Sequence, residues 1–432
     1  MMTKGYITLV QSIAPVMALC LSTPSLAQAT APVPPSGAGP AVTPAAAPAT
    51  TPAPAPKAIT PYADLRYRLE LVDQAGFARD ATASTLRVRA GLRTAEWHGL
   101  SAQIEGEAIA RIGPADYNDT VNGQTAFPVV ADPSDIMLNQ AFVRYRPIAQ
   151  LDATLGRQAI NFDNQRWVGS VGWRQNDQTL DAVRVTARPV PQAAIDYVHS
   201  WRVNRIFGPD STQGIWRHND IHLVRAQAAL APLGTLVGYG YWLDIPASPA
   251  LSSRTFGVRL SGEQALGHGV KLTYAAEYAR QSDHGLNPRN FGHDYLLLEP
   301  GLTVGPVTAR LGYERLEGDG TTALQTPLAT LHAFNGWADK FLTTPAGGLR
   351  DLYFDATWRL PTLAGVQGAS ARVIWHDYNA TRGGANYGHE WNALLNVPVA
   401  RGITTSVKFA HYDAQSFATD TDKFWFSVEA RF

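Results

Sequence analysis

The sequence predicts an all-β protein: a transmembrane antiparallel β-barrel of 18 strands, with the N- and C-termini in the periplasm. Three observations lead to this prediction. Apolar and polar residues alternate with period two in one segment after another. The gaps between these segments are alternately long and short, and the last segment keeps the alternation up to the final residue, Phe432.

Residues 1–58 are predicted to lie outside this fold. Residues 1–29 have one early lysine, an apolar run from about 7 to 21 and small residues near their end, which is the pattern of a signal peptide. Residues 30–58 are almost wholly Ala, Pro, Thr and Gly, so we expect a disordered linker and assign residues 59–432 to the barrel. Cys20 is the only cysteine, so the exported protein would have no disulfide.

The alternation defines the strands. In the first one, Leu65, Tyr67 and Leu69 alternate with Arg66 and Arg68, as expected of a strand with one apolar and one wet face. Most segments have 10 to 13 residues, close to what a tilted strand needs to cross a bilayer. In chain order the strands are predicted at 61–72, 82–94, 100–111, 137–146, 151–162, 179–188, 192–202, 218–230, 234–243, 252–262, 269–281, 293–303, 307–317, 350–360, 369–379, 389–397, 403–413 and 423–432.

The gaps indicate how the barrel is oriented. They are long after odd-numbered strands, as at 112–136 and 318–349, and short after even-numbered strands, as at 189–191 and 231–233. Outer-membrane barrels have short periplasmic turns and long external loops. Because hydrocarbon leaves unpaired backbone groups unsatisfied, the first and last strands should pair, and a barrel of this size should enclose an aqueous lumen.

Composition and motifs exclude several classes of function. Lys+Arg and Asp+Glu balance at 36 each, which argues against a nucleic-acid partner. The nucleophile-elbow, zinc-protease and phosphate-loop motifs are missing, so we predict no enzyme, no cofactor and no metal centre. His218 and His222 would share a strand face, and we interpret them as pore or rim histidines rather than metal ligands.

The predicted register points many arginines into the lumen, and Arg87, Arg89, Arg310 and Arg359 are candidates for solute binding. A guanidinium group binds carboxylates through a planar fork and stays charged. These arginines could therefore conduct an anionic solute. The other interpretation is that they pair with carboxylates of the wall and stiffen it.

The densest polar segment is LGRQAINFDNQRWVGSVGWRQNDQTLDAVRV, from Leu155 to Val185. Its order of Gly-Arg-Gln, Asn-Gln-Arg-Trp-Val-Gly, Gly-Trp-Arg-Gln-Asn and Thr-Leu-Asp-Ala-Val-Arg resembles the hallmark segment of the bacterial alginate-export family of outer-membrane barrels. The resemblance implies a narrow pore whose constriction, or the loop lining it, contains Arg157, Arg166, Arg174, Asp181 and Arg184. Trp167 and Trp173 of the same segment are candidates for stacking on a sugar.

The resemblance thus implies an outer-membrane channel that passes an anionic polysaccharide or a related organic anion. The alternative is a general or nutrient-uptake porin for small hydrophilic solutes, and a third interpretation is a barrel enzyme or adhesin acting through its long loops. We expect the protein in the outer membrane of a Gram-negative bacterium, in contact with its lipid. The amphipathic last strand ending in Phe432 resembles the strand by which the barrel-assembly machinery recognises its substrates.

Overall fold

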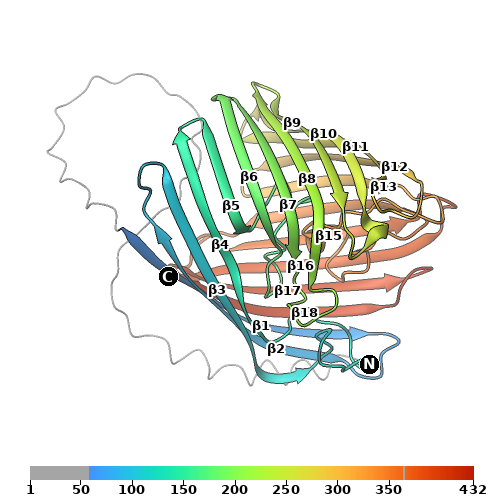
Figure 1. The fold of residues 1–432 in the computed structure, drawn as a ribbon. Coiled ribbons are helices and arrows are strands. Elements are labelled where there is room, and N and C mark those ends of the chain that lie inside the picture. The colour runs from blue at the N-terminus through green and yellow to red at the C-terminus, as the bar shows by residue number, and fades with distance from the viewer. Residues whose placement is uncertain (1–57, 363–364) are drawn as a thin grey trace. The chain divides into compact units, whose positions relative to one another are not determined.

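The structure is a computed structural model that describes residues 58–362 and 365–432. The expected signal peptide and nearly all of the expected linker lie outside the described residues. The described part contains two short 3-10 helices, η2 (Pro249–Leu251) and η3 (Leu331–Ala333), and 18 strands (Figure 1). The strands are β1 (Ile59–Gln74), β2 (Ala81–Thr94), β3 (Leu100–Asp116), β4 (Asp135–Ile148), β5 (Leu151–Gln158), β6 (Thr179–Val190), β7 (Ala193–Asn204), β8 (Ile215–Leu230), β9 (Gly234–Asp244), β10 (Ser253–Gly267), β11 (Val270–Asp283), β12 (Gly292–Val304), β13 (Val307–Leu316), β14 (Leu349–Arg359), β15 (Ser370–Asn379), β16 (Asn386–Ala400), β17 (Ile403–Ala414) and β18 (Thr421–Arg431).

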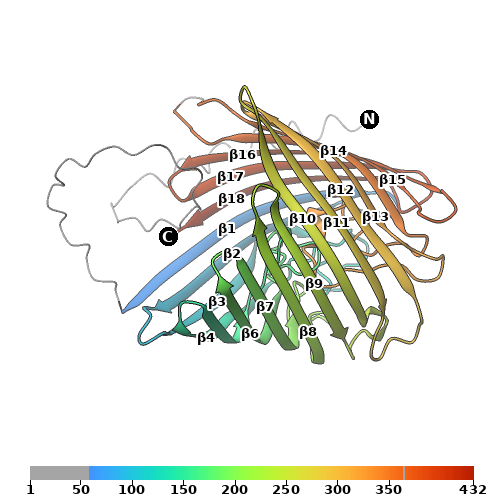
Figure 2. The ribbon, with the colours of Figure 1, turned by 90° about the horizontal axis from the view of Figure 1, so that it is seen from above.

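The sheet closes on itself. Every strand is antiparallel to its neighbours in the sequence, and β18 pairs with β1 from Asp64↔Arg431 to Gln74↔Thr421. Figure 2 shows β1 between β18 and β2. Closure pairs the edge groups that hydrocarbon could not hydrate. The predicted antiparallel barrel of 18 strands is confirmed.

The two ends of the barrel differ in the length of their connections. At one end, which we call the short-turn end, tight turns such as 191–192 and 305–306 join the strands, and the longest connection there is 360–369. At the other end, the long-loop end, the connections include 117–134, 159–178 and 317–348. The predicted asymmetry of the loops is therefore present in the structure.

The outer face of the wall is apolar. Side chains that alternate with the lumen-facing ones are exposed although they are aliphatic or aromatic, including Ile104, Val143, Leu155, Val258, Leu311, Phe354, Val373 and Phe409. Exposed aromatic residues lie towards the short-turn end (Trp97, Tyr145, Trp358) and towards the long-loop end (Trp201, Tyr278, Trp391). Transmembrane barrels have such an apolar band between two aromatic girdles. The described residues include no helix long and apolar enough to cross a membrane.

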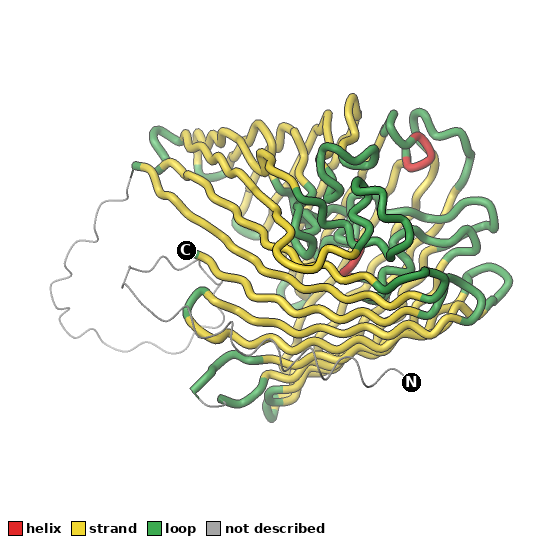
Figure 3. The backbone as a smooth tube through the Cα atoms, turned by 90° about the horizontal axis from the view of Figure 1, so that it is seen from below, coloured by secondary structure: helices red, strands yellow, loops and turns green. Residues whose placement is uncertain are grey.

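Two long loops enter the barrel. Ile160 and Gln175 of the 159–178 loop, and Leu324 and Leu328 of the 317–348 loop, are almost completely buried although no strand contains them. Figure 3 shows loop segments inside the ring of strands. The interior therefore has a packed section made of loops rather than a uniformly open lumen.

The predicted strand at 151–162 is too long, because β5 ends at Gln158. Ile160 and Phe162 have the parity of the lumen-facing Asp152 and Gln158, and they pack against Trp167, Val168 and other residues of the interior. The Gln158 amide donates hydrogen bonds to the carbonyl groups of Ala182, at 3.2 Å, and Gly156, at 3.3 Å. The wall thus ends where the chain turns inward.

Candidate functional site: a constriction formed by two loops

The 159–178 loop is anchored to β1 through its own backbone. Arg66 donates hydrogen bonds to the carbonyl oxygens of Gly172, at 2.8 Å, and Arg174, and to the Gln175 amide oxygen, at 3.1 Å. Arg68 donates to the Trp173 carbonyl. Arg66 and Arg68 therefore hold the backbone carbonyls of three consecutive loop residues, 172 to 174, and the side-chain amide of Gln175.

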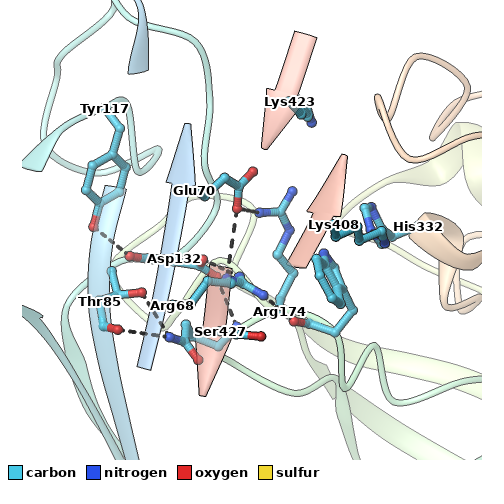
Figure 4. A network of polar contacts seen from close by, with 12 residues as sticks. Arg68, Glu70, Thr85, Tyr117, Asp132, Arg174, His332, Lys408, Lys423 and Ser427 are labelled. Atoms are coloured by element: carbon cyan, nitrogen blue, oxygen red, sulfur yellow. Dashed lines mark hydrogen bonds and ion pairs between the residues drawn. The ribbon is translucent and has the colours of Figure 1, made fainter. Parts of the chain in front are cut away.

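Arg174 connects the loop to two other elements. Its guanidinium group lies 3.0 Å from a carboxylate oxygen of Glu70 in β1 and 3.2 Å from one of Asp339 in the 317–348 loop. Arg68 forms an ion pair with Asp132, whose other oxygen accepts a hydrogen bond from the Gln175 backbone N–H at 3.0 Å (Figure 4). Because these groups are buried, loss of one partner would leave an uncompensated charge.

The other end of the 159–178 loop reaches the opposite stretch of wall. Arg166 pairs with Glu314 of β13 at 2.8 Å, and the Trp167 indole N–H donates to Glu277 of β11 at 2.7 Å. Glu277 also accepts hydrogen bonds from Tyr239, at 2.6 Å, and Arg259, at 2.6 Å. The loop thus spans the lumen from β1 to β11 and β13.

The 317–348 loop closes a second part of the lumen. The Asn335 amide donates to Glu314 at 2.6 Å and to Asp351 at 3.0 Å, and the Ala338 N–H donates to Glu390 at 2.8 Å. The two loops also bond to each other, since the Gly169 N–H donates to the Leu328 carbonyl at 2.8 Å. Together they form one hydrogen-bonded constriction.

Lys408 of β17 lies where the two loops meet. Its ammonium group is 3.9 Å from the ring centre of Trp173 and 3.8 Å from that of Trp337, one residue from each loop, and it donates to His332 Nε2 at 2.5 Å. Trp173 stacks on the His332 ring at 4.6 Å between ring centres. Within residues 58–362 and 365–432, Lys408 has no salt-bridge partner. It is therefore a buried lysine of the lumen, held by aromatic rings and an imidazole.

The loop groups next to Lys408 have shifted pKa values. Burial lowers the pKa of His332 to about 3, although Asp339 opposes this. A neutral imidazole fits both contacts, because Nδ1–H can donate to Asp339, at 2.6 Å, while Nε2 accepts from Lys408. Burial alone would raise the pKa of Asp339, but His332 and Lys423 outweigh it and hold that pKa well below its usual value. Asp339 is thus an ionised carboxylate inside the constriction.

A cavity of about 350 Å³ adjoins this constriction and extends towards the short-turn end. Trp173, His332 and Trp337 of the loops line it, with the wall residues Arg66, Arg68, Arg372, Lys408, Glu429, Ser406 and Ser427. A second cavity of about 180 Å³ shares Trp337 and Arg372 with the first and reaches Glu299 and Glu314. The first is of the size that holds a small molecule, and it is lined by four cations and one carboxylate.

Most of the predicted site arginines have carboxylate partners. Arg157 pairs with Asp181 at 2.7 Å and Arg184 with Asp196 at 2.7 Å on the wall of β5 to β7. The remaining wall arginines of the prediction pair similarly, Arg87 with Asp64, Arg89 with Glu107 and Asp177, and Arg310 with Asp355. Arg359 is exposed at the short-turn end and donates to the Gly305 carbonyl at 3.1 Å. The structure brings Arg166, Arg174, Trp167 and Trp173 together in the inward loop and leaves Arg359 far along the wall.

Sequence reasoning missed Lys408, His332 and Trp337. Lys408 stands on the lumen face of β17 between Ser406 and Ala410, and these two neighbours on that face carry no charge. A single lysine without an adjacent carboxylate was the signal that the sequence offered. His332 and Trp337 lie in the long 317–348 loop, and the sequence gives no register for a loop. Their positions depend on the fold of that loop.

Comparison with known families gives one match. Residues 62–206 match the model of the alginate export family, a stretch that includes most of β1, all of β2 to β7 and the whole 159–178 loop. No curated protein matches the chain. The resemblance first noted in the Leu155–Val185 segment therefore extends to the N-terminal part of the barrel.

Comparison with solved structures shows the same architecture over nearly the whole barrel. OccAB4 of Acinetobacter baumannii has 15% identity and a TM-score of 0.68, with 87% of this chain and 98% of that chain covered. OpdK of Pseudomonas aeruginosa, solved with vanillate, has 15% identity and a TM-score of 0.67, with 86% and 98% covered. OpdL of the same organism has 15% identity and a TM-score of 0.65, with 87% and 98% covered. The fold of this chain is that of outer-membrane, porin-like β-barrels.

Proposed function

We propose that the protein is an outer-membrane channel for the uptake of small organic anions, with carboxylates as the solute class. In this proposal the short-turn end and both termini face the periplasm, and the long loops face outward. Among the functions that the sequence left open, the proposed one is closest to the nutrient-uptake porin. It adds the preference for anions that was expected of the export-type channel.

One observation carries the proposal: the cavity next to the constriction is small and presents Lys408 without a carboxylate partner among the described residues. Arg372 lines the same cavity and shares the carboxylate of Asp355 with Arg310, at 2.8 and 3.1 Å. An anionic solute would supply the missing negative charge, and Ser406 and Ser427 would offer hydroxyl groups beside it.

The packing of the constriction favours a small solute over a polymer. The two loops are tied to β1, β11, β13 and β16 and to each other by buried hydrogen bonds and ion pairs. A polysaccharide chain in transit must occupy a continuous path, which would require several of these buried contacts to break together. A small anion requires only local movement around Trp173 and Trp337.

OpdK supports the same solute class by analogy, because that protein was solved with vanillate, an aromatic carboxylate. Export of an anionic polysaccharide remains the second candidate function. The observation that favours it is the match of residues 62–206 to the alginate export family.

Electrical recording in planar bilayers separates the two candidates. We expect small, anion-selective single-channel currents that aromatic and aliphatic monocarboxylates block at lower concentration than uronate oligomers do. Liposomes that contain the protein should also take up radiolabelled monocarboxylates faster than neutral sugars of equal size. Block by uronate oligomers alone, with no effect of monocarboxylates, would support the exporter. A large current without ion preference would reject both.

A further inference from the structure

Three potential metal ligands meet on the outer face of the barrel, away from the constriction. They are His199 of β7 and Asp220 and His222 of β8, whose ligand atoms all lie within 4.8 Å of one another. We propose that they form a binding site for a divalent transition-metal ion of the zinc class. This inference is independent of the solute that the channel conducts.

Strand pairing creates the cluster. His199 and His222 are opposite each other in the β7–β8 ladder, so their side chains leave the sheet on the same side. Asp220 precedes His222 by two residues and shares its face. The inward positions of the same strands, Val198 and Ile221, are completely buried, which places the three ligands on the outside.

The distances suit a shared ion. An oxygen of Asp220 lies 2.9 Å from His222 Nε2 and 3.6 Å from His199 Nδ1. The two imidazole rings lie 4.7 Å apart between centres. Ligand atoms bound to one tetrahedral zinc ion are roughly 3–3.5 Å apart, given bonds of about 2.0–2.2 Å to N and O. Small side-chain rotations would therefore bring all three atoms into coordination.

Tyr197 orients one of the ligands. Its hydroxyl group lies 2.8 Å from His222 Nδ1, the ring nitrogen that faces away from Asp220. If Nδ1 carries the proton and donates it to Tyr197, Nε2 keeps its lone pair for a metal ion. An outer partner of this kind is typical of metal-binding histidines.

Two features of the cluster are unfavourable without a cation. His199 Nδ1 is shielded from solvent and has no hydrogen-bond partner among the described residues. Asp220 is also opposite Asp244 in the β8–β9 ladder, so the two carboxylate side chains leave the sheet on the same side. Like charges at opposed positions repel, and a divalent ion at Asp220 would reduce that repulsion.

The donor set selects the type of ion. Imidazole is a good ligand for zinc and its neighbours, whereas calcium and magnesium prefer sites made of oxygen atoms. Three protein ligands leave one position of a tetrahedron, which water can fill. The ion would also cross-link β7 to β8 in the long-loop half of the wall, near the exposed Trp201.

The test is a titration of the untagged, full-length protein in detergent, after treatment with a chelator. We expect one equivalent of Zn²⁺ to bind in competition with a chromophoric chelator, and Co²⁺ to give the strong visible absorption of a tetrahedral complex. Excess Mg²⁺ or Ca²⁺ should not displace either ion. Loss of only an outer partner of a metal ligand usually weakens metal binding roughly 10–100-fold. His199→Gln and His222→Gln each remove a ligand itself, so each should weaken Zn²⁺ binding by more than this. Tyr197→Phe should remain within that range.

His389→Gln is the matched control. His389 also faces outward beside a carboxylate, with Nε2 at 3.5 Å from Asp413, but it has no second histidine opposite it. This variant should bind Zn²⁺ like the unchanged protein. Heat-dependent migration in SDS gels shows whether each variant is folded. Asp220→Asn is a third variant that changes a proposed ligand. The proposal is wrong if the unchanged protein binds no more Zn²⁺ than the folded double variant His199→Gln/His222→Gln.

Discussion

Lys408 and Trp337 form a contact between the barrel wall and a loop, with the ammonium group 3.8 Å from the centre of the indole ring. The ring centre of Trp173, in the other loop, lies 3.9 Å from the same ammonium group. One cation of β17 therefore contacts both halves of the constriction and lines the cavity next to it. Its charge should affect which ions pass, and its aromatic contacts should affect how firmly the loops pack.

Replacement of Lys408 by methionine should lower the preference of the channel for anions. Methionine keeps the length of the side chain and its contact with the tryptophans but removes the charge. A unit charge acts on an ion 4 Å away with about 1 kcal/mol in a water-like medium, which corresponds to roughly a fivefold change in occupancy. We expect a decrease of about that size in the anion-to-cation permeability ratio, measured from reversal potentials under a salt gradient.

Lys271→Met is the control for this experiment. Lys271 is half-exposed near the short-turn end and pairs with Glu263 at 2.7 Å. The variant removes the same charge far from the constriction, so selectivity should remain as in the unchanged protein. Equal effects of the two variants would mean that net charge, rather than the position of Lys408, sets the selectivity.

The sequence predicted the wall well and the constriction only in part. Period-two alternation reports local geometry, so Leu65 to Glu70 already defined which residues face the lumen, and the alternating gap lengths defined the hairpins. The bonds of Arg174 to Glu70 and Asp339 join residues more than a hundred positions apart, and alternation within a strand contains no information about such pairs. The polar Leu155–Val185 segment indicated which loop to consider, but not that Arg66 and Arg68 would bind its backbone.

Glu70→Gln should loosen the constriction. Glu70 is fully buried and neutralises Arg174, so the amide would leave part of that charge uncompensated. Loss of one partner of a buried pair costs roughly 3–5 kcal/mol, and the remaining contact of Arg174 with Asp339 should keep the cost near the lower value. We expect a higher mean single-channel conductance with frequent switching between conductance levels, because the 159–178 loop would lose part of its anchor.

Glu263→Gln tests whether any loss of a carboxylate has this effect. Glu263 belongs to a half-exposed ion pair, and surface pairs contribute only about 0–1 kcal/mol. Its conductance and switching should match the unchanged protein. Unchanged conductance in Glu70→Gln, in a protein that is folded by gel migration, would show that the Arg174 contacts do not hold the loop in place.

A lysine at Val373 should destabilise the barrel in a bilayer. Val373 is 44% exposed on the outer face of β15, among other apolar side chains. A lysine that faces lipid near the middle of the bilayer costs roughly 2–4 kcal/mol. Thr357→Lys is the control, because Thr357 is opposite Arg372 and faces the lumen. Reversible urea unfolding in lipid vesicles should separate the two variants, and equal stability would contradict the register of β14 and β15.

The packing of the 317–348 loop should weaken as the pH falls below neutral. Burial lowers the pKa of His332 to about 3, whereas the same side chain in an unfolded segment titrates near 6.5. The unfolded segment therefore binds a proton in this range that the packed loop does not, and its stability decreases with falling pH by up to about 1.4 kcal/mol per unit. Asp339 has a lowered pKa and keeps its contribution until the pH falls below its ordinary value of 3.8. Between pH 6.5 and 4, His332 should thus contribute a loss of stability to which Asp339 adds nothing.

Hydrogen–deuterium exchange of peptides that cover residues 328–341 measures this effect, after correction for the intrinsic dependence of exchange on pH. We expect protection to decrease from pH 6.5 to 4 in the unchanged protein and to change much less in His332→Gln, whose side chain stays neutral. His98→Gln, at an exposed turn of the short-turn end, should behave like the unchanged protein. The same loss of protection in His332→Gln would show that a different group titrates, and the neutral-imidazole assignment between Asp339 and Lys408 would then be incorrect.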